Sequence, residues 1–187
     1  LVSRFTDAAA VSVDGFGDFA SAAWGVGRGG AIEVADKVYF PHSLGIFYQA
    51  LTQYIGFPRY GEEYKVMGLA PYGEPRFLIE MRKIVHLLDD GRFKLDLRYF
   101  RHVSEKAEYE WDNGSPTVGD LYSPALLDLL GPARSADEPL EQRHKDIARS
   151  VQVRFEEAAV HCLNRMHRLI PTQRFVMAGG CALNGVA

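Results

Sequence analysis

The first forty residues alternate short apolar runs with glycine turns. The small, β-branched run over 8–13 is followed by runs over 18–26 and 31–40, and Gly29 and Gly30 separate the last two. Runs of this length joined by tight glycine turns are typical of strands that pair antiparallel. The pattern therefore predicts a three-stranded meander at the edge of a mixed sheet.

Helical periodicity dominates the rest of the chain. Apolar side chains at positions 44, 47, 51, 54 and 55 fall on one helical face, between a Ser43 cap and a stop at Gly56. A shorter helix is expected within 61–73, where glycines and a proline punctuate the chain. Further stripes of the same period predict helices over 75–90 with a stop at Gly91, over 121–130, and over 139–170, the last long and amphipathic.

Two more strands are expected in the second half. Apolar and charged residues alternate over 93–99, which predicts a half-buried strand. The segment 174–178, in which four apolar residues follow Arg174, predicts a buried strand that leads into Gly179. Between them, the polar segment 102–119 holds Trp111 and the turn sequence over 112–114, and we expect it to shape the mouth of a substrate site.

Length, charge and cysteine content narrow the class of protein. With 187 residues, 47% of them hydrophobic, the chain can bury a substantial core. A net charge of −3 with a pI near 6.1 offers no field for nucleic acid. No apolar run is long enough for a membrane span, so no membrane partner is expected. Cys162 and Cys181 do not form a disulfide framework, which predicts a reducing, cytoplasmic location.

Both ends of the sequence look like cuts in a longer protein. The chain begins with Leu1 rather than Met, and it stops at Ala187, a few residues into an expected helix. We therefore expect a fragment.

The first candidate site is the sequence Asp14, Gly15, Phe16, Gly17, Asp18 at the end of the first predicted strand. A carboxylate followed by glycines that expose backbone N–H groups is suited to a metal–phosphate pair. The same residues also suit a hairpin turn, because Asp-Gly is a strong turn signal. The residues alone leave both interpretations open.

A second candidate lies within 61–73. The carboxylates of Glu62 and Glu63 are suited to ribose hydroxyls, and Lys65 to a phosphate. The alternative is a solvated helix face with a Glu–Lys pair. His42, just before a predicted helix, is either a ligand or proton donor or, more commonly for such a residue, structural.

The third candidate follows the predicted strand over 174–178. Gly179 and Gly180 allow the backbone to approach a flat ligand at the carboxyl end of a sheet, and Asn184 has an amide suited to the edge of a nucleotide. His161 and His167 are six positions apart on the long helix, so they do not share a face and are poor joint metal ligands.

Four motifs in this order resemble those of the O-carbamoyltransferases of the nodulation-protein and antibiotic-tailoring type. The motifs are SVDGFGD at 12–18, HSLG at 42–45 with Tyr48, EYKVMGLAPYG at 63–73, and AGGCALN at 178–184. The resemblance covers nearly the whole chain. Four motifs in one order are more specific than any one of them.

The resemblance implies an α/β fold of the actin/Hsp70/sugar-kinase type, in which ribonuclease-H-like lobes with mixed sheets and flanking helices enclose a nucleotide. This region of the family is similar to the tRNA threonylcarbamoyl-transfer subunit. On that basis we expect residues 1–73 to belong to a first lobe, 74–136 to a connecting insertion, and 137–187 to the start of a second lobe.

The resemblance also implies an activity and its cofactors. The family forms carbamoyl-adenylate from ATP and carbamoyl phosphate, then transfers the carbamoyl group to a hydroxyl of a sugar or other natural product. A separate carboxy-terminal domain makes the adenylate and is outside this sequence. The acceptor and the oligomeric state are not given by the residues.

Family roles carry over to individual positions. Asp14 corresponds to a ligand of an iron-type divalent metal, Gly15 and Gly17 to the phosphate-side turn, and Glu63 and Lys65 to the wall of the same cleft, with Glu62 a competing acid. Gly179, Gly180 and Asn184 correspond to the nucleoside-binding motif.

The chain also departs from the family pattern. The family's His-x-x-x-His pair and its second aspartate ligand have no counterpart here. A single ligand holds a metal poorly, so we expect the fragment alone to be inactive. The alternatives are another actin-like enzyme, such as a tRNA threonylcarbamoyl-type transferase or a sugar kinase, and a non-catalytic nucleotide-binding module.

Overall fold

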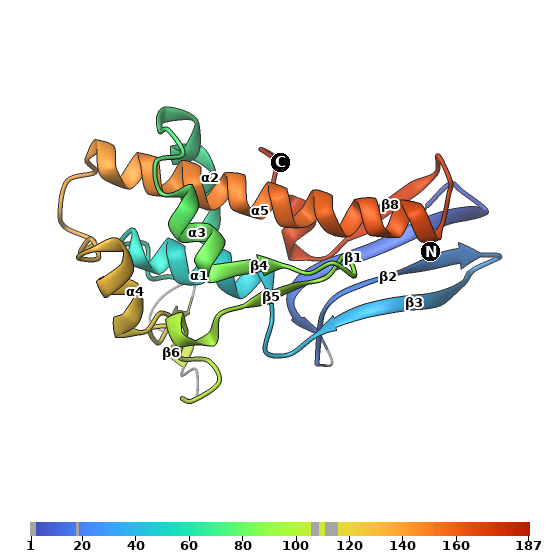
Figure 1. The fold of residues 1–187 in the computed structure, drawn as a ribbon, viewed down its shortest axis with the longest axis horizontal. Coiled ribbons are helices and arrows are strands. Elements are labelled where there is room, and N and C mark those ends of the chain that lie inside the picture. Colours follow the sequence, from blue (N-terminus) through green and yellow to red (C-terminus); the bar gives the residue numbers. More distant parts are fainter. Residues whose placement is uncertain (1–2, 18, 106–108, 111–115) are drawn as a thin grey trace.

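The structure, a computed structural model, describes residues 3–17, 19–105, 109–110 and 116–187. A four-stranded sheet lies at one end of the molecule in the view of Figure 1 and most of the shorter helices at the other, while one long helix runs past both. The strand order is β3-β2-β1-β8. The strands are β1 (Asp7–Gly17), β2 (Ala20–Arg28), β3 (Ala31–Tyr39) and β8 (Phe175–Ala178).

The predicted meander and the mixed sheet are both confirmed. β1 pairs antiparallel with β2, and β2 with β3, while β8 pairs parallel with β1 on its other side. Gly29 and Gly30 turn the chain between β2 and β3 with positive φ angles of 54° and 87°, which glycine adopts without strain. The mixed α/β class is therefore established for the described residues.

β1 is longer than the sequence predicts. It continues past Val13 to Gly17, with a register shift against β2 between these two residues. Asp14 and Gly15 thus lie in an irregular part of the strand and do not form the hairpin turn. The turn comes after Gly17 and includes Phe19 at φ 68°. Asp18, the last residue of the predicted motif, lies outside the described residues.

β8 differs from its prediction as a buried strand. Phe175 is 40% exposed and Met177 37% exposed. The physical reason is position, because among the described residues β8 is an edge strand that pairs with β1 alone. The run of apolar residues over 174–178 carries no signal that separates an edge strand from a central one.

The helices predicted from periodicity are mostly confirmed. In α1, the Ser43 hydroxyl accepts a hydrogen bond from the Ile46 N–H at 3.1 Å, and Gly56 follows the helix at φ 90°. The confirmed helices are α1 (Leu44–Tyr54), α2 (Glu63–Leu69) with the 3₁₀ turn η1 (Ala70–Tyr72), α4 (Pro124–Leu130) and the 28-residue α5 (Gln142–Leu169).

Two predictions in the middle of the chain are wrong in part. The helix expected over 75–90 is α3 (Leu78–Ile84), and Val85–Leu87 instead forms β4, which pairs with β5 (Phe93–Leu95). The strand expected over 93–99 ends early, because the Asp96 carboxylate accepts a hydrogen bond from the Arg98 N–H and caps the 3₁₀ turn η2 (Leu97–Tyr99). Strand pairing across the Gly91 turn therefore determines the structure of 85–87, although the apolar residues there have helical periodicity.

The polar segment 102–119 contains a short ribbon of β6 (Tyr109–Glu110) and β7 (Thr117–Val118). Trp111 and residues 112–114, which the sequence analysis singled out, lie outside the described residues. At the other end, β8 leads directly into the 3₁₀ turn η3 (Gly180–Leu183).

One hydrophobic core runs through all three predicted segments. Val11 from β1, Phe47 from α1, Met81 from α3 and Val151 from α5 belong to the same buried cluster. The strand β8 from 137–187 also completes the sheet of 1–73. The predicted division into lobes stays a prediction, since within the described residues no separate core marks a boundary.

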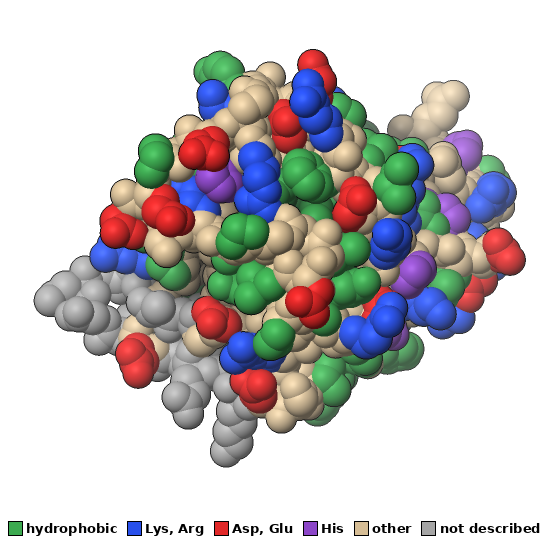
Figure 2. Space-filling view, turned by 60° about the vertical axis from the view of Figure 1, so that its left-hand side comes forward, with side chains coloured by type: hydrophobic (Ala, Val, Ile, Leu, Met, Phe, Trp, Pro, Cys, Tyr) green, Lys and Arg blue, Asp and Glu red, His purple; other side chains and the backbone are tan. Residues whose placement is uncertain are grey.

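The distribution of charged side chains on the surface agrees with the small net charge of the sequence. On the described part of the face in Figure 2, basic and acidic side chains lie interspersed over the molecule. No helix within the described ranges is both long and apolar enough to cross a membrane.

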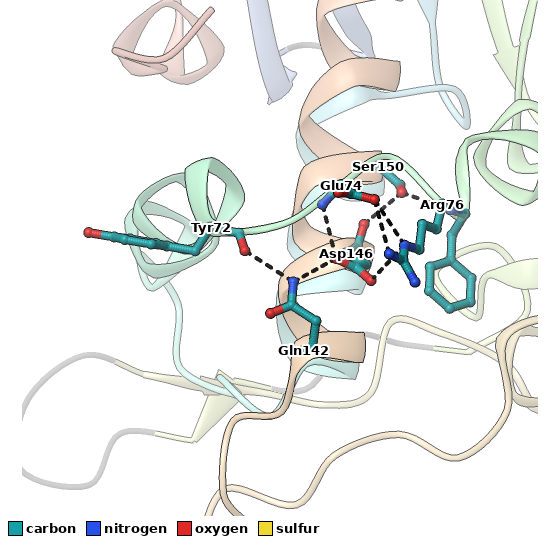
Figure 3. A network of polar contacts seen from close by, with 7 residues as sticks. Tyr72, Glu74, Arg76, Gln142, Asp146 and Ser150 are labelled. Atoms are coloured by element: carbon teal, nitrogen blue, oxygen red, sulfur yellow. Dashed lines mark hydrogen bonds and ion pairs between the residues drawn. The ribbon is translucent and has the colours of Figure 1, made fainter.

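A polar network, here called the α5 clamp, fixes the chain after α2 against α5 (Figure 3). It consists of Tyr72, Glu74, Arg76, Gln142, Asp146 and Ser150. The buried Asp146 carboxylate accepts hydrogen bonds from the Glu74 N–H and the Gln142 amide, both at 2.9 Å. Gln142 also donates to the Tyr72 carbonyl at 3.1 Å. The clamp thereby fixes the end of the segment that begins with α2.

Gly73 lets the clamp close. A Cβ at this position would lie 2.0 Å from the Lys145 carbonyl oxygen, far inside van der Waals contact. The backbone after η1 therefore packs directly on the backbone of α5. Because α2 and η1 are continuous, this contact also determines where α2 presents its side chains.

Candidate functional site

A cavity of about 320 Å³ opens where β1 and β8 end next to the first turn of α1. Its walls come from β1, α1, the segment 60–67, α5 and η3. This volume is at the lower end of the range for small-molecule sites. Parallel strands with their carboxyl ends at one sheet edge commonly form such a crevice.

Glycines bring the walls of the cavity together. A Cβ on Gly45 would lie 2.7 Å from the Gly15 Cα, so α1 and β1 meet through two residues without side chains. A Cβ on Gly180 would lie 3.0 Å from the Asp14 Oδ1 atom. Gly179 has φ 93°, and a Cβ there would lie 2.2 Å from the Val13 carbonyl oxygen. The glycine pair after β8 is therefore required for close approach to β1.

Asp14 presents its carboxylate at the surface of the cavity. The residue is exposed, and its Oδ1 accepts a hydrogen bond from the Gly15 N–H at 2.8 Å. Its carbonyl oxygen accepts a hydrogen bond from the Ser43 hydroxyl at 3.1 Å. Since Ser43 also caps α1, this residue joins the strand that carries Asp14 to the helix that forms the next wall.

Glu63, rather than Glu62, faces the cavity. Partial burial raises the pKa of Glu63, although backbone N–H groups oppose the shift. Glu62 pairs instead with Lys65, whose ammonium group lies 5.1 Å from the centre of the Phe57 ring. Lys65 is thus held against Glu62 and Phe57 and does not line the cavity, unlike the expectation that it shares the cleft wall.

Asn184 borders the cavity, but its amide is engaged within the protein. It forms a reciprocal pair with the buried Gln152, donating at 3.0 Å and accepting at 3.1 Å. Its Oδ1 also accepts hydrogen bonds from the N–H groups of Val186 and Ala187, both at 3.2 Å. The side chain therefore fixes the turn after η3 to α5. Its predicted contact with a nucleoside stays a prediction.

Tyr48 and Cys181 complete the cavity wall as neutral groups. The Tyr48 hydroxyl donates to the Gln152 Oε1 at 2.8 Å, and burial raises the pKa of Tyr48. Burial also raises the pKa of Cys181 to about 12, with the charges of Asp14 and Glu63 adding to the shift. The Cys181 thiol is consequently protonated at neutral pH and is not an activated nucleophile.

Two of the histidines singled out in the sequence, His42 and His161, have structural roles. The His42 Nδ1 accepts a hydrogen bond from the Leu95 N–H at 3.2 Å, and burial lowers the pKa of His42. A ring nitrogen of His161 lies 2.8 Å from the Leu88 carbonyl oxygen. Neither residue lines the cavity.

Sequence reasoning missed Gln49 and the exposed aromatic residues of the cavity. Tyr60 is 52% exposed and Tyr64 is 64% exposed, and both line the cavity together with the buried Gln49. The available signal was the helical register, because Gln49 is four positions after Gly45 and shares its face. Gln49 lies outside the apolar stripe of this helix and belongs to no motif named above, so it was overlooked.

The described residues do not by themselves make a metal site. Within the described ranges, no group of three or more His, Cys, Asp and Glu side chains is close enough to hold an ion. Asp14 is a single exposed carboxylate, and divalent metals in proteins use several ligands. The cavity wall is open at Gly15, where a Cβ would meet nothing within 4 Å, whereas Gly45 and Gly180 pack closely against β1.

The family can now be stated from comparison with known proteins. Residues 1–187, the whole chain, match the family model of the carbamoyltransferase N-terminus. The chain belongs to the carbamoyltransferase family. Its match is to the amino-terminal part of that family, which confirms the resemblance drawn from the four motifs.

Three known proteins are similar to the chain over nearly its whole length. The chain is 34% identical to Nodulation protein NolO of Bradyrhizobium diazoefficiens over 191 residues, covering 98% of the chain and 30% of the relative. It is 34% identical to Nodulation protein NolNO of Sinorhizobium fredii over 193 residues, covering 98% and 24%. An uncharacterized Synechocystis protein, sll1178, is 36% identical over 187 residues, covering 99% and 28%. The chain thus spans less than a third of the length of each of these relatives.

Proposed function

We propose that this chain is the amino-terminal part of an ATP-dependent O-carbamoyltransferase. The protein would use carbamoyl phosphate and ATP to form carbamoyl-adenylate and transfer its carbamoyl group to a hydroxyl of a sugar or natural product. The observation that carries the proposal is the family match along the whole chain. The cavity beside Asp14 and Glu63 supports it with a site of suitable size and polarity.

In the transfer step, the acceptor hydroxyl oxygen attacks the carbamoyl carbon. The bond between that carbon and the phosphate oxygen breaks, AMP leaves, and the hydroxyl proton passes to a base or to water. The enzyme's main task is to position the two reactants, since the adenylate already contains a good leaving group.

The chain's own residues have defined parts in this proposal. Gly15 lines the cavity, and a Cβ there would meet nothing within 4 Å, so a ligand can approach this part of the backbone closely. Gly45 and Gly180 bring α1 and η3 against β1. The Glu63 carboxylate is an acceptor for ligand hydroxyls such as those of ribose. Asp14 lines the cavity and would supply one ligand to the expected divalent ion, which requires further ligands.

The proposed fold is ribonuclease-H-like within an actin-type architecture. The support is the antiparallel meander β3-β2-β1 extended by the parallel strand β8, with α1 and α5 packed into the core beside it. The carboxy-terminal adenylate-forming domain is proposed for the complete protein on the basis of the family alone.

The test uses the complete protein that contains this chain. It is incubated with ATP, carbamoyl phosphate and a panel of hydroxylated acceptors, while pyrophosphate release and carbamoylated product are followed by mass spectrometry. Pyrophosphate release together with a carbamoylated acceptor is expected. Absence of pyrophosphate under every metal condition contradicts the adenylate route, and nucleotide binding without turnover favours a non-catalytic binding module.

A further inference from the structure

Gln49 lies in α1 and lines the cavity, yet its side-chain Nε2 atom has no hydrogen-bond partner within the described residues. The residue is 8% exposed, and the Nε2 atom is buried without a partner. Buried side-chain amides are nearly always paired, because an unpaired donor loses its hydration without compensation. An unpaired amide in a cavity wall is therefore suited to a ligand.

Gln53, one turn further along the same helix, provides a direct contrast. It is 6% exposed, so its burial is similar. Its Oε1 accepts a hydrogen bond from the Leu121 N–H at 2.8 Å, and its Nε2 donates to the Gly119 carbonyl oxygen at 3.3 Å. Two glutamines of one helix thus have opposite states: the protein itself satisfies Gln53 and leaves Gln49 unsatisfied.

The chemistry of the cavity limits what pairs with Gln49. Asp14 and Glu63 line the same space, and carboxylates only accept hydrogen bonds. Two acidic groups disfavour a bare phosphate next to them, so the part of the ligand in contact with this wall is uncharged and carries donors.

A glutamine amide is complementary to an edge with a donor next to an acceptor. Glutamine and asparagine pair in this bidentate way with adenine. A carbamoyl group has the same arrangement, with a carbonyl oxygen next to an NH₂ group. The terminal torsion of glutamine is broad, so either end of the Gln49 amide can turn toward the ligand.

We propose that Gln49 is a specificity-determining ligand contact of this cavity, where its amide pairs with an uncharged donor–acceptor edge. The edge belongs to adenine or to the carbamoyl group, which share this chemistry. The choice of these two ligands rests on the proposed function, whereas the contact itself rests on the state of the Gln49 amide.

The experiment compares Gln49→Met with Gln53→Met in the complete protein. Methionine keeps the length of the side chain and removes its hydrogen bonds. Affinities for adenosine and for carbamoyl phosphate are measured separately by calorimetry, and thermal midpoints are recorded for each variant. The two titrations separate an adenine contact from a carbamoyl contact.

For Gln49→Met, the Kd of at least one probe rises about three- to tenfold, the effect of one lost neutral hydrogen bond, while the midpoint stays the same or rises. For Gln53→Met, the midpoint falls and both Kd values stay at the wild-type level. Where Gln49→Met does not fold, Gln49→Asn withdraws the amide by one methylene and is expected to raise the same Kd.

The contact is overturned when both Kd values of the folded Gln49 variant equal those of the wild type, or when the wild type binds neither probe. The proposed function fails separately. Wild-type protein that releases no pyrophosphate, but binds adenosine through Gln49, retains the contact and loses the carbamoyl-adenylate chemistry. Full transfer activity of the wild type, together with unchanged Kd values in the Gln49 variant, retains the carbamoyl-adenylate chemistry and overturns the contact.

Discussion

The α5 clamp and the cavity wall contain the same kinds of side chain in opposite states. In the clamp, the buried Asp146 carboxylate accepts two hydrogen bonds from within the protein and lies 3.5 Å from the Arg76 side chain. In the cavity wall, the Asp14 carboxylate is exposed and the Gln49 amide is buried without a partner among the described residues. The first set stabilises the fold, while the second set is available to a ligand.

This difference distinguishes residues that stabilise the fold from residues that are available to a ligand. Burial of a polar group costs free energy unless it is paired, so partnered groups contribute to stability and unpartnered ones reduce it. Changes in the clamp are therefore expected to affect unfolding, and changes in the cavity wall are expected to affect ligands. The following variants of the complete protein test that separation.

The largest effect is expected for Asp14→Asn. The change removes the charge next to Gly15 and Gly180 but keeps the shape of the side chain, so carbamoyl transfer is expected to fall at least about 100-fold with little change in stability. Product formation and the thermal midpoint are measured together. Unchanged turnover returns Asp14 to a purely structural role in the β1 irregularity.

Asp146→Ala tests the clamp. Loss of the buried acceptor leaves the Glu74 N–H and the Gln142 amide without their partner, which is expected to lower the free energy of unfolding by about 2–3 kcal/mol. Denaturant unfolding measures this change. The matched control is Asp90→Ala, which breaks an exposed ion pair with Arg92 and is expected to cost less than about 1 kcal/mol.

The pH dependence of the clamp has a defined sign. Burial raises the pKa of Asp146, but the Glu74 and Gln142 hydrogen bonds and the Arg76 charge outweigh it, so the net pKa lies below the ordinary value of 3.8. The stabilisation is present above pH 3.8 and is lost as the pH falls through the lowered value. Equal acid sensitivity of wild type and Asp146→Ala contradicts this account.

Gly180→Val tests the narrow side of the cavity. Its Cβ would already lie 3.0 Å from the Asp14 Oδ1, and the two further methyl groups occupy space that a ligand needs. Affinity for adenosine is expected to fall at least about tenfold. Gly185→Val is the matched control, because a Cβ at Gly185 meets nothing within 4 Å. Equal affinities of the two variants count against the cavity.

Glu63→Gln is expected to have the smallest effect, a loss of about three- to tenfold in adenosine affinity at pH 7. Burial raises the pKa of Glu63 above 4.5, so wild-type affinity falls as the pH drops through the raised value, while the affinity of the variant stays constant. Titrations across this range measure the difference. Glu62→Gln, whose side chain pairs with Lys65, is expected to bind like the wild type.

The stability of Glu63→Gln gives a second check. Because the folded pKa is raised, the ionised carboxylate opposes folding increasingly as the pH rises from 4.5 through the raised value. The variant is therefore expected to be as stable as the wild type, or more stable, at pH 7. A clear loss of stability would mean that Glu63, like Asp146 in the α5 clamp, stabilises the fold.

Local signals predicted much of this fold. The Ser43 cap, the Gly56 stop and the apolar stripe between them all lie within one short stretch of sequence, so α1 followed from the sequence alone. The 85–90 segment did not, because pairing of Val85 with Leu95 across a turn decides its structure. Hydrophobic periodicity is a property of one segment at a time, so it gives no information about pairing between two segments.

The candidate site likewise has residues that the sequence predicts and residues that it does not. Asp14, Gly180 and Glu63 stand in recognisable motifs, and all three line the cavity. The attachment of Asn184 to Gln152 joins positions 32 apart, which no local pattern contains. Gln49 was missed because its missing partner is a property of three-dimensional packing.

The most direct test is a crystal structure of the complete protein grown with ATP and carbamoyl phosphate. We predict electron density for a ligand in the cavity between Asp14, Gln49 and Glu63, with a ligand atom within hydrogen-bond distance of the Gln49 amide. A structure in which the ligand occupies another part of this chain, and only solvent fills this cavity, contradicts the account.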